Sequence, residues 1–261
     1  MKNKIRFSVL ASGSRGNVCY VEADNAKILI DAGLSCRETE RRLKLLGIMP
    51  EKLNAVIITH EHTDHIKGAG PLARRFDLPL YINQKTFEKS LKTIGNLSRP
   101  VIIQTGQPLT IEGINIQTFT KCHDAADPFG LVVSFNGVKI GLATDLGRST
   151  RLIEDHLKGC NALIVEFNYD QEMLEKGPYP LELKRRIKGQ DGHLSNQQAG
   201  DLLRSVSDDN LRHVVLAHLS EKNNHIDKAF DEAADALGGS GVGGVNILIS
   251  RQDESCPMIE L

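Results

Sequence analysis

The sequence predicts an α/β (α+β) fold of four layers, in which two mixed β-sheets pack face to face and helices cover their outer sides (an αββα sandwich). Short apolar strands dominate the first half of the chain, and helical patterns separate the strands of the second half. Several strands also end at a His or an Asp, which predicts a functional site where the loops at one edge of the sandwich converge. We expect the 261 residues to form one domain, with a basic segment inserted near residues 170–195.

The first half begins with short apolar or alternating segments separated by Gly, Ser, Asn and Asp, which predicts an antiparallel β-meander. Strands are expected at 5–11, 17–22, 27–31, 55–59 and 80–82, and helices at 36–47, 66–76 and 84–93. The first of these helices is amphipathic and ends at Gly47.

The second half begins with strands between 101 and 119 that are broken by Gly106 and Gly113. Further strands are expected at 130–136, 138–143, 161–167, 214–217 and 245–250, and helices at 149–157, 196–206 and 225–236. Asn136-Gly137 is typical of a hairpin turn. Ser195 has the side chain of a helix N-cap.

Composition sets limits on the class of protein. The formal net charge is −1, so no overall electrostatic attraction to nucleic acid or membrane is expected. No apolar stretch approaches the length of a membrane helix, and the N-terminus runs into a strand pattern without a signal-peptide core. The five cysteines include no Cys-x-x-Cys pair, which argues against a disulfide framework and a structural zinc knot. We therefore expect a cytoplasmic protein.

Residues 60–65, His-Glu-His-Thr-Asp-His, predict a metal site at the end of the strand at 55–59. His60 and His62 are two residues apart and can bind one ion together, whereas Asp64 and His65 project differently and can reach a second ion. This spacing differs from the His-Glu-x-x-His helix of single-zinc proteases. A polar, solvated loop is the alternative, but burying unpaired His and Asp beside a core strand would be costly.

Other predicted strands end at residues of the same types. His123 could complete a three-histidine set with His60 and His62, and Asp145 has the two oxygens needed to bridge two cations. His218 follows the strand at 214–217. Each of these residues also has an ordinary structural explanation when taken singly, but their recurrence at strand ends favours a shared metal site.

Asp31 follows the third strand and precedes Ala32-Gly33. A carboxylate there can orient metal-bound histidines from behind, and Gly33 would permit an unusual backbone turn. The alternative is that Asp31 is only a turn residue.

The loop Ser12-Gly13-Ser14-Arg15-Gly16-Asn17 is rich in Gly and Ser. It could hold a phosphate through its backbone N–H groups, but it lacks the Lys-Ser/Thr of a P-loop. A plain tight turn is an equal alternative.

The order of these motifs resembles the metallo-β-lactamase-fold hydrolases over essentially the whole chain. The resemblance implies an αββα sandwich of metallo-β-lactamase type and two divalent metal ions. It implies one metal held by His60, His62 and His123, a second held by Asp64, His65 and His218, and Asp145 between them. It also implies that Asp31 supports the ligands structurally. His and Asp ligands suit Zn²⁺, Mn²⁺ and Fe²⁺ alike.

Several motifs are similar to those of the YycJ (WalJ) subgroup of this family. They are Ala11-Ser12-Gly13-Ser14, the segment 60–65, His123-Asp124-Ala125-Ala126, Lys184-Arg185-Arg186, Gly192-His193-Leu194-Ser195-Asn196 and His218-Leu219-Ser220. This resemblance implies a 5′-to-3′ DNA exonuclease linked to DNA repair, with DNA favoured over RNA as the substrate. It also implies substrate contacts by Ser12, Ser14, Asn168, Lys184, Arg185, Arg186 and Ser195. Tyr169 departs from the subgroup, in which a His is expected after Asn168, so a substrate contact at that position is in doubt.

Three residues are predicted to be catalytic. Gly192-His193-Leu194-Ser195 resembles an element of tRNA 3′-processing enzymes that handles a proton at the scissile phosphate, so we predict His193 as a proton donor or phosphate clamp. Asp64 and Asp145 would orient the attacking nucleophile as metal ligands. The alternative for His193 is a hydrogen bond to the N-terminus of its own helix.

Two further questions stay open at this stage. The basic segment with Lys184, Arg185 and Arg186 either follows a phosphate backbone or forms an ordinary solvated helix face. The alternative functions are a thioester or lactone hydrolase of the glyoxalase II or lactonase type, a metal-binding but inactive interaction protein, and a redox diiron protein. A monomer and a homo-oligomer are both compatible with the sequence.

Overall fold

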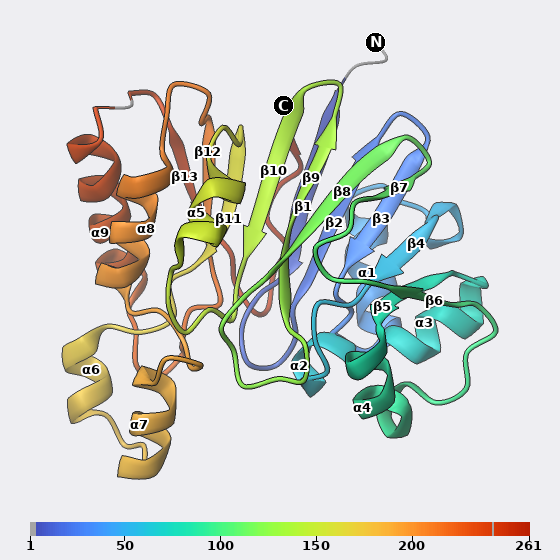
Figure 1. Cartoon of the computed structure of the whole chain (residues 1–261), viewed down its shortest axis with the longest axis horizontal. Coiled ribbons are helices and arrows are strands. Elements are labelled where there is room, and N and C mark those ends of the chain that lie inside the picture. The colour runs from blue at the N-terminus through green and yellow to red at the C-terminus, as the bar shows by residue number, and fades with distance from the viewer. Residues whose placement is uncertain (1–3, 242) are drawn as a thin grey trace.

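The computed structural model describes residues 4–241 and 243–261 and confirms the four-layer arrangement. Figure 1 shows two mixed sheets face to face, with helices on the outer side of each sheet. The first sheet has the order β14-β1-β2-β3-β4-β5-β6, and the second has the order β13-β12-β11-β10-β9-β8-β7.

The first sheet begins as an antiparallel meander and continues as parallel strands. Its strands are β1 (Ile5–Ala11), β2 (Val18–Ala23), β3 (Ala26–Ile30), β4 (Ala55–Ile57), β5 (Leu80–Asn83), β6 (Pro100–Ile103) and β14 (Ile259–Glu260). The two-residue strand β14 pairs antiparallel with β1, and its shortness explains why no strand is predicted there.

The second sheet has three antiparallel pairs followed by three parallel pairs. Its strands are β7 (Leu109–Ile111), β8 (Ile114–Thr120), β9 (Phe129–Phe135), β10 (Val138–Ala143), β11 (Ala162–Glu166), β12 (His213–Ala217) and β13 (Asn246–Ile249). Asn136 and Gly137 both have positive φ angles in the predicted hairpin between β9 and β10, as a type I′ turn requires.

Helices flank each sheet on its outer side. They are α1 (Cys36–Leu45), α3 (Ala69–Phe76) and α4 (Gln84–Ile94) with the first sheet, and α5 (Arg151–Leu157), α8 (Asn196–Val206) and α9 (Ile226–Gly239) with the second. The short helix α2 (Thr63–Ile66) lies at one end of the sandwich. A short 3-10 helix, η1, covers Pro50–Lys52. Two more helices, α6 (Gln171–Lys176) and α7 (Leu181–Lys188), lie away from both sheets at the end of the molecule where α2 lies (Figure 1). They occupy the predicted inserted segment near 170–195.

Three hydrophobic layers hold the sandwich together. Inward-facing side chains such as Ile28 and Ile164 form the layer between the two sheets. The outer layers contain helix residues, Leu72 of α3 on one side and Leu202 of α8 on the other. Strands covered on both faces read as nearly continuous apolar runs, which is why β3, β4 and β11 are easy to recognise in the sequence.

Strand direction gathers the predicted site residues at one edge. Because β1, β3 and β4 run in one direction in the first sheet, and β8, β10, β11 and β12 share a direction in the second, their carboxyl ends lie together. In the second sheet, Ala143, Val165 and Leu216 are aligned across the three parallel strands, so these strands end side by side.

The helix predicted at 66–76 is wrong at its beginning. A helical turn, α2, already starts at Thr63, and α3 follows at Ala69 after a break at Lys67-Gly68. The backbone N–H of His65 donates to the carbonyl of His62 at 2.8 Å. Asp64 and His65 therefore lie in a helical turn rather than in the predicted loop.

The predicted role of Gly33 also needs correction, because the left-handed residue is Asp31, with φ of +60°. Gly33 instead allows two backbones to approach closely. A Cβ at this position would lie 1.6 Å from the carbonyl oxygen of Asp64. Only glycine fits against the turn that carries Asp64 and His65.

We predict that Gly33→Ala lowers the stability of the fold by about 3 kcal/mol or more, because the backbone of α2 must move to admit a methyl group. The matched control is Gly239→Ala near the end of α9, where a Cβ would have no neighbour within 4 Å. Urea unfolding of both variants measures the difference. Equal stability of Gly33→Ala and the wild type would contradict the proposed close contact.

Candidate metal centre

Three histidines form a first cluster at the edge of the sandwich. His60 follows β4, His62 is the N-cap residue of α2, and His123 follows β8. Each offers a ring nitrogen, and these nitrogens all lie within 4.8 Å of one another. His62 Nδ1 is 3.1 Å from His123 Nε2. The structure thus brings together the three histidines that the sequence assigns to one ion.

Neighbouring groups orient the rings of this cluster. Thr59 Oγ1 lies 3.0 Å from His60 Nδ1, and the carbonyl of Gly192 lies 3.2 Å from His123 Nδ1. These contacts leave the Nε2 atoms of His60 and His123 directed at the centre of the cluster. Hydrogen bonds of this kind fix the tautomer of a metal-binding histidine.

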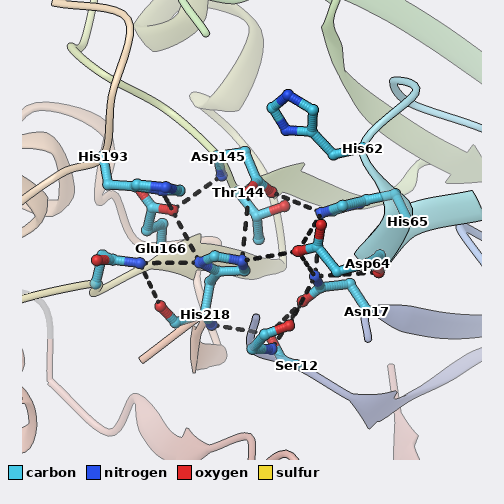
Figure 2. A network of polar contacts seen from close by, with 12 residues as sticks. Ser12, Asn17, His62, Asp64, His65, Thr144, Asp145, Glu166, His193 and His218 are labelled. Carbon is cyan, nitrogen blue, oxygen red and sulfur yellow. Dashed lines mark hydrogen bonds and ion pairs between the residues drawn. The ribbon is translucent and has the colours of Figure 1, made fainter. Parts of the chain in front are cut away.

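A second cluster contains the other four predicted ligands: Asp64, His65, Asp145 and His218. His65 Nε2 lies 3.6 Å from Asp64 Oδ2 and 3.3 Å from Asp145 Oδ2. His218 Nε2 lies 3.6 Å from Asp64 Oδ2 and 3.4 Å from Asp145 Oδ1. Figure 2 shows the side chains of all four directed toward one another.

Asp145 connects the two clusters. Besides its contacts in the second cluster, Asp145 Oδ1 lies 4.0 Å from His123 Nε2. Asp145 is 2% exposed, so its carboxylate sits between the two sets of histidines with little access to water. This is the position that the sequence analysis predicts for a bridging ligand.

The side chains fit divalent cations. In the part of the chain that the structure describes, His60 Nε2, His218 Nε2 and Asp145 Oδ2 are buried and have no hydrogen-bond partner. Buried polar atoms in native proteins are nearly always paired, so three unpaired atoms at one point indicate a missing partner. Imidazole and carboxylate donors at this spacing suit Zn²⁺, Mn²⁺ or Fe²⁺.

Asp31 lies behind the second cluster, as predicted. Its Oδ2 is 2.7 Å from His65 Nδ1, and its Oδ1 accepts a hydrogen bond from the backbone N–H of Thr59 at 2.8 Å. Asp31 therefore orients His65 and at the same time anchors the strand end from which His60 projects.

Glu166 is a site residue that the sequence analysis did not include. It is fully buried, and its Oε2 accepts from the backbone N–H of Asp145 at 3.1 Å and lies 2.8 Å from His193 Nδ1. Its Oε1 accepts from the backbone N–H of Leu194 at 2.7 Å. The same pattern that identifies Asp31 and Asp145, an acid at the end of an apolar strand, was present in the sequence here.

Asn17 and Lys121 also support the site, and the sequence indicates their roles less clearly than that of Glu166. Asn17 Nδ2 is 3.0 Å from His65 Nε2 and 3.2 Å from Asp64 Oδ2, so it holds the second cluster from the Gly-Ser loop. Lys121 is buried, and its ammonium donates to the carbonyl of Thr144 at 2.6 Å. This cation offsets part of the negative charge of the neighbouring carboxylates.

His193 lies beside the second cluster. Its ring is stacked on that of His218, with ring centroids 5.1 Å apart (Figure 2). The alternative of a hydrogen bond to its own helix is replaced by the contact with Glu166, since Ser195 is the residue that caps α8. His193 also lines a cleft of about 180 Å³, here called the His193 cleft, together with Ser14, Asn168, Arg186 and His218.

Some residues predicted to contact substrate use their polar atoms inside the protein instead. Ser12 Oγ accepts from the backbone N–H of His218 at 2.7 Å, and Ser195 Oγ accepts from that of Gln198 at 3.2 Å. Both serines are buried. The prediction that these serines contact substrate therefore needs correction. The hydroxyl of Ser12 supports the site and that of Ser195 caps α8, and neither residue lines the His193 cleft.

The basic residues of α7 have different surroundings. Arg186 Nε donates to Asp124 Oδ2 at 2.6 Å across the His193 cleft. Lys184 donates to the carbonyl of Glu175 at 2.7 Å, and Arg185 is exposed. Of the three, Arg186 is the one directed at the cleft.

The structure also describes the Gly-Ser loop and the position of Tyr169. The Gly-Ser loop is a tight turn, in which the N–H of Gly16 donates to the carbonyl of Gly13 at 3.1 Å. Tyr169 is buried and forms an isolated β-bridge with Ser195.

In the metal-free protein, the two clusters differ in protonation. Burial alone lowers the pKa of His218, but Asp145, Asp64 and Glu166 outweigh it and raise this pKa to about 9. The pKa of His65 is likewise raised well above its usual value by Asp145, Asp31 and Asp64 against the effect of burial. Burial lowers the pKa of His123 to about 4 and that of His60 well below its usual value. The second cluster therefore holds protons that a metal ion would have to displace.

Comparisons with known proteins agree with this geometry. Residues 26–219 match the model of the β-lactamase superfamily domain. The chain is 40% identical to exodeoxyribonuclease YycJ of Bacillus anthracis over 92% of this chain and 91% of that protein. It is 33% identical to exodeoxyribonuclease WalJ of Streptococcus pneumoniae serotype 2, over 98% of each. The solved structure of the metallo-β-lactamase-fold protein YhfI from Bacillus subtilis has a TM-score of 0.75 at 19% identity, and the match covers all of both chains.

We predict that Asp31→Asn weakens divalent metal binding by about 10- to 100-fold, because the amide no longer supplies the negative charge that holds His65 as a ligand. Asn tolerates the left-handed backbone of this position. Asp24→Asn is the matched control, since Asp24 is also left-handed but exposed in the turn between β2 and β3. Competition with a chromophoric chelator measures both affinities, and unchanged affinity in Asp31→Asn would refute the assigned role.

We also predict that metal loading of the metal-free protein depends on pH in two ways. Burial lowers the pKa of His123 to about 4 and that of His60 well below its usual value, so these two ligands need not lose a proton near neutral pH, and the first ion should bind with the weaker pH dependence. His65 and His218 must lose protons, so binding of a second ion should strengthen at least about tenfold per pH unit up to about pH 9. Calorimetry in buffers of different ionisation enthalpy detects the released protons. An identical pH dependence for every bound ion would contradict the assignment.

Proposed function

This chain belongs to the β-lactamase superfamily, and on that premise we propose that it is a metal-dependent phosphodiester hydrolase, specifically a 5′-to-3′ DNA exonuclease linked to DNA repair. The observation that supports this most is the buried His and Asp cluster beside a cleft that contains His193 and Arg186. Relatives of similar length that are named exodeoxyribonucleases favour DNA over RNA as the substrate.

We infer that the chain binds two divalent ions, Zn²⁺, Mn²⁺ or Fe²⁺. His60, His62 and His123 would hold one, Asp64, His65 and His218 the other, and Asp145 would contact both. When bound, such ions lower the pKa of water and neutralise charge that builds up on phosphoryl oxygens. Asp64 and Asp145 would hold these ions, and through them would orient the attacking nucleophile.

His193 is the proposed proton donor or phosphate clamp. Glu166 Oε2 is 2.8 Å from His193 Nδ1 and accepts a hydrogen bond from the N–H at that position, so Nε2 is the atom available to the His193 cleft. In this orientation a protonated His193 can donate to the leaving oxygen of a phosphodiester. Glu166 is a positioning residue in this scheme, because it acts through His193.

Substrate binding is assigned to the open side of the site. Ser14, Asn168 and Arg186 line the His193 cleft, and Lys184 and Arg185 extend the positive charge along α7. Arg186 is paired with Asp124, and a phosphate would compete with this carboxylate for the guanidinium.

Location is a further part of the proposal. All five cysteines lie within the described residues and none forms a disulfide, which suits a cytoplasmic protein. Across the described ranges, no helix is both long and apolar enough to cross a bilayer.

We predict that the purified protein shortens end-labelled DNA with Mn²⁺ or Zn²⁺, and that Asp64→Asn lowers this activity more than about 100-fold, because it removes a charged ligand. Single- and double-stranded DNA and RNA, labelled at either end, determine the substrate and the polarity. Asp24→Asn should retain full activity. Hydrolysis of a thioester, with no cleavage of any of these nucleic acids, would replace the proposal with the small-molecule alternative.

A further inference from the structure

Part of the lining of the His193 cleft is apolar, and this part is here called the apolar wall. Tyr179, Leu183 and Ile187 line the cleft together with His193 and His218. Leu183 and Ile187 belong to α7, a helix whose eight residues are all described and include no buried side chain. Their apolar surface therefore does not serve the protein core, and it faces the space in front of the proposed metal site.

The backbone at Tyr179 is restricted by its neighbours. It stands between Pro178 and Pro180, whose rings restrict the backbone on both sides, and Pro180 is the N-cap residue of α7. The ammonium of Lys222 lies 5.9 Å from the centroid of the Tyr179 ring. The ring is half-buried, so part of its surface remains available to a ligand. An aromatic side chain on a restricted backbone loses less entropy when it binds a flat partner than one on a mobile loop.

The polar and apolar residues that line the cleft together indicate the class of ligand. His193 and Arg186 suit the phosphate of a nucleotide, as would divalent ions held by the His and Asp cluster, whereas the flat, apolar part of a nucleotide is its base. We propose that Tyr179 stacks on a nucleobase next to the scissile phosphate, while Leu183 and Ile187 exclude water from it. This inference rests on the proposed function and narrows its substrate class.

The size of the cleft adds a restriction. A volume of about 180 Å³ is enough for one nucleobase. Stacking on Tyr179 requires a base that has left its own stack, as at a single-stranded or frayed end. Every base has an aromatic face, so stacking on Tyr179 selects for the presence of a base and not for its identity.

The test compares two short single strands: six thymidine nucleotides, and the same backbone with tetrahydrofuran abasic residues throughout. We expect kcat/KM of the wild type to be about 5- to 150-fold higher for the strand with bases. Tyr179→Ala should remove this preference mainly through KM and leave hydrolysis of the abasic strand unchanged. Tyr179→Phe, which keeps the ring, should retain the preference. Leu181→Ala is the matched control, because Leu181 is 63% exposed on the same helix.

Four measurements separate the outcomes. If Tyr179→Ala lowers kcat/KM equally for both strands, or for neither, the stacking role is overturned. Thermal melting of each variant shows whether a loss comes from unfolding. Binding of fluorescent forms of both strands, measured by anisotropy in EDTA, tests the base preference even without turnover. Failure to hydrolyse either strand or bis(p-nitrophenyl) phosphate would overturn the proposed function, whereas base-independent binding would overturn only the role of Tyr179.

Discussion

Burial of negative charge where the two sheets meet is the constraint on which the site depends. Asp31, Asp145 and Glu166 are each at most 3% exposed, and an unpaired carboxylate in such a place would cost several kcal/mol or more. Each is therefore paired: Asp31 with His65 and Thr59, Asp145 with His65 and His218, and Glu166 with His193 and backbone N–H groups. Within these ion pairs, Asp145 Oδ2 and His218 Nε2 make no hydrogen bond to any described residue, and neither does His60 Nε2, which is the arrangement that divalent cations would complete.

Three residues of the site adopt an unfavourable backbone conformation. Asp31, Asp145 and His218 all have positive φ angles of 54–60° directly after or near a strand end, a conformation that costs on the order of 1 kcal/mol or more per residue. Hydrogen bonds hold each one in place, from the N–H of Asp31 to Ile57, from that of Asp145 to Glu166, and from that of His218 to Ser12. Leaving the strand through the left-handed region turns each side chain into the cluster instead of along the sheet.

The His and Asp cluster and the apolar wall of the cleft are attached to the fold in different ways. The His and Asp cluster is attached to strand ends that lie over a continuous core, so its geometry is fixed by the packing of the whole sandwich. The apolar wall of the His193 cleft is carried by α7 and the residues just before it. All residues of α7 are described, and none of them is buried. Side chains of this wall can therefore change without disturbing the proposed metal ligands. This agrees with the general observation that function varies on a constant fold.

The sequence by itself determined the layers and most of the strands, because apolar runs and turn residues carry that information locally. It also identified all seven proposed metal ligands, since each follows an apolar strand or lies in the segment 60–65. Only the tertiary structure decided which serines face inward, that Glu166 orients His193, and that Gly33 serves close packing against Asp64. These facts depend on contacts between residues as far apart as Ser12 and His218, and no local pattern specifies the partner or the direction of such a contact.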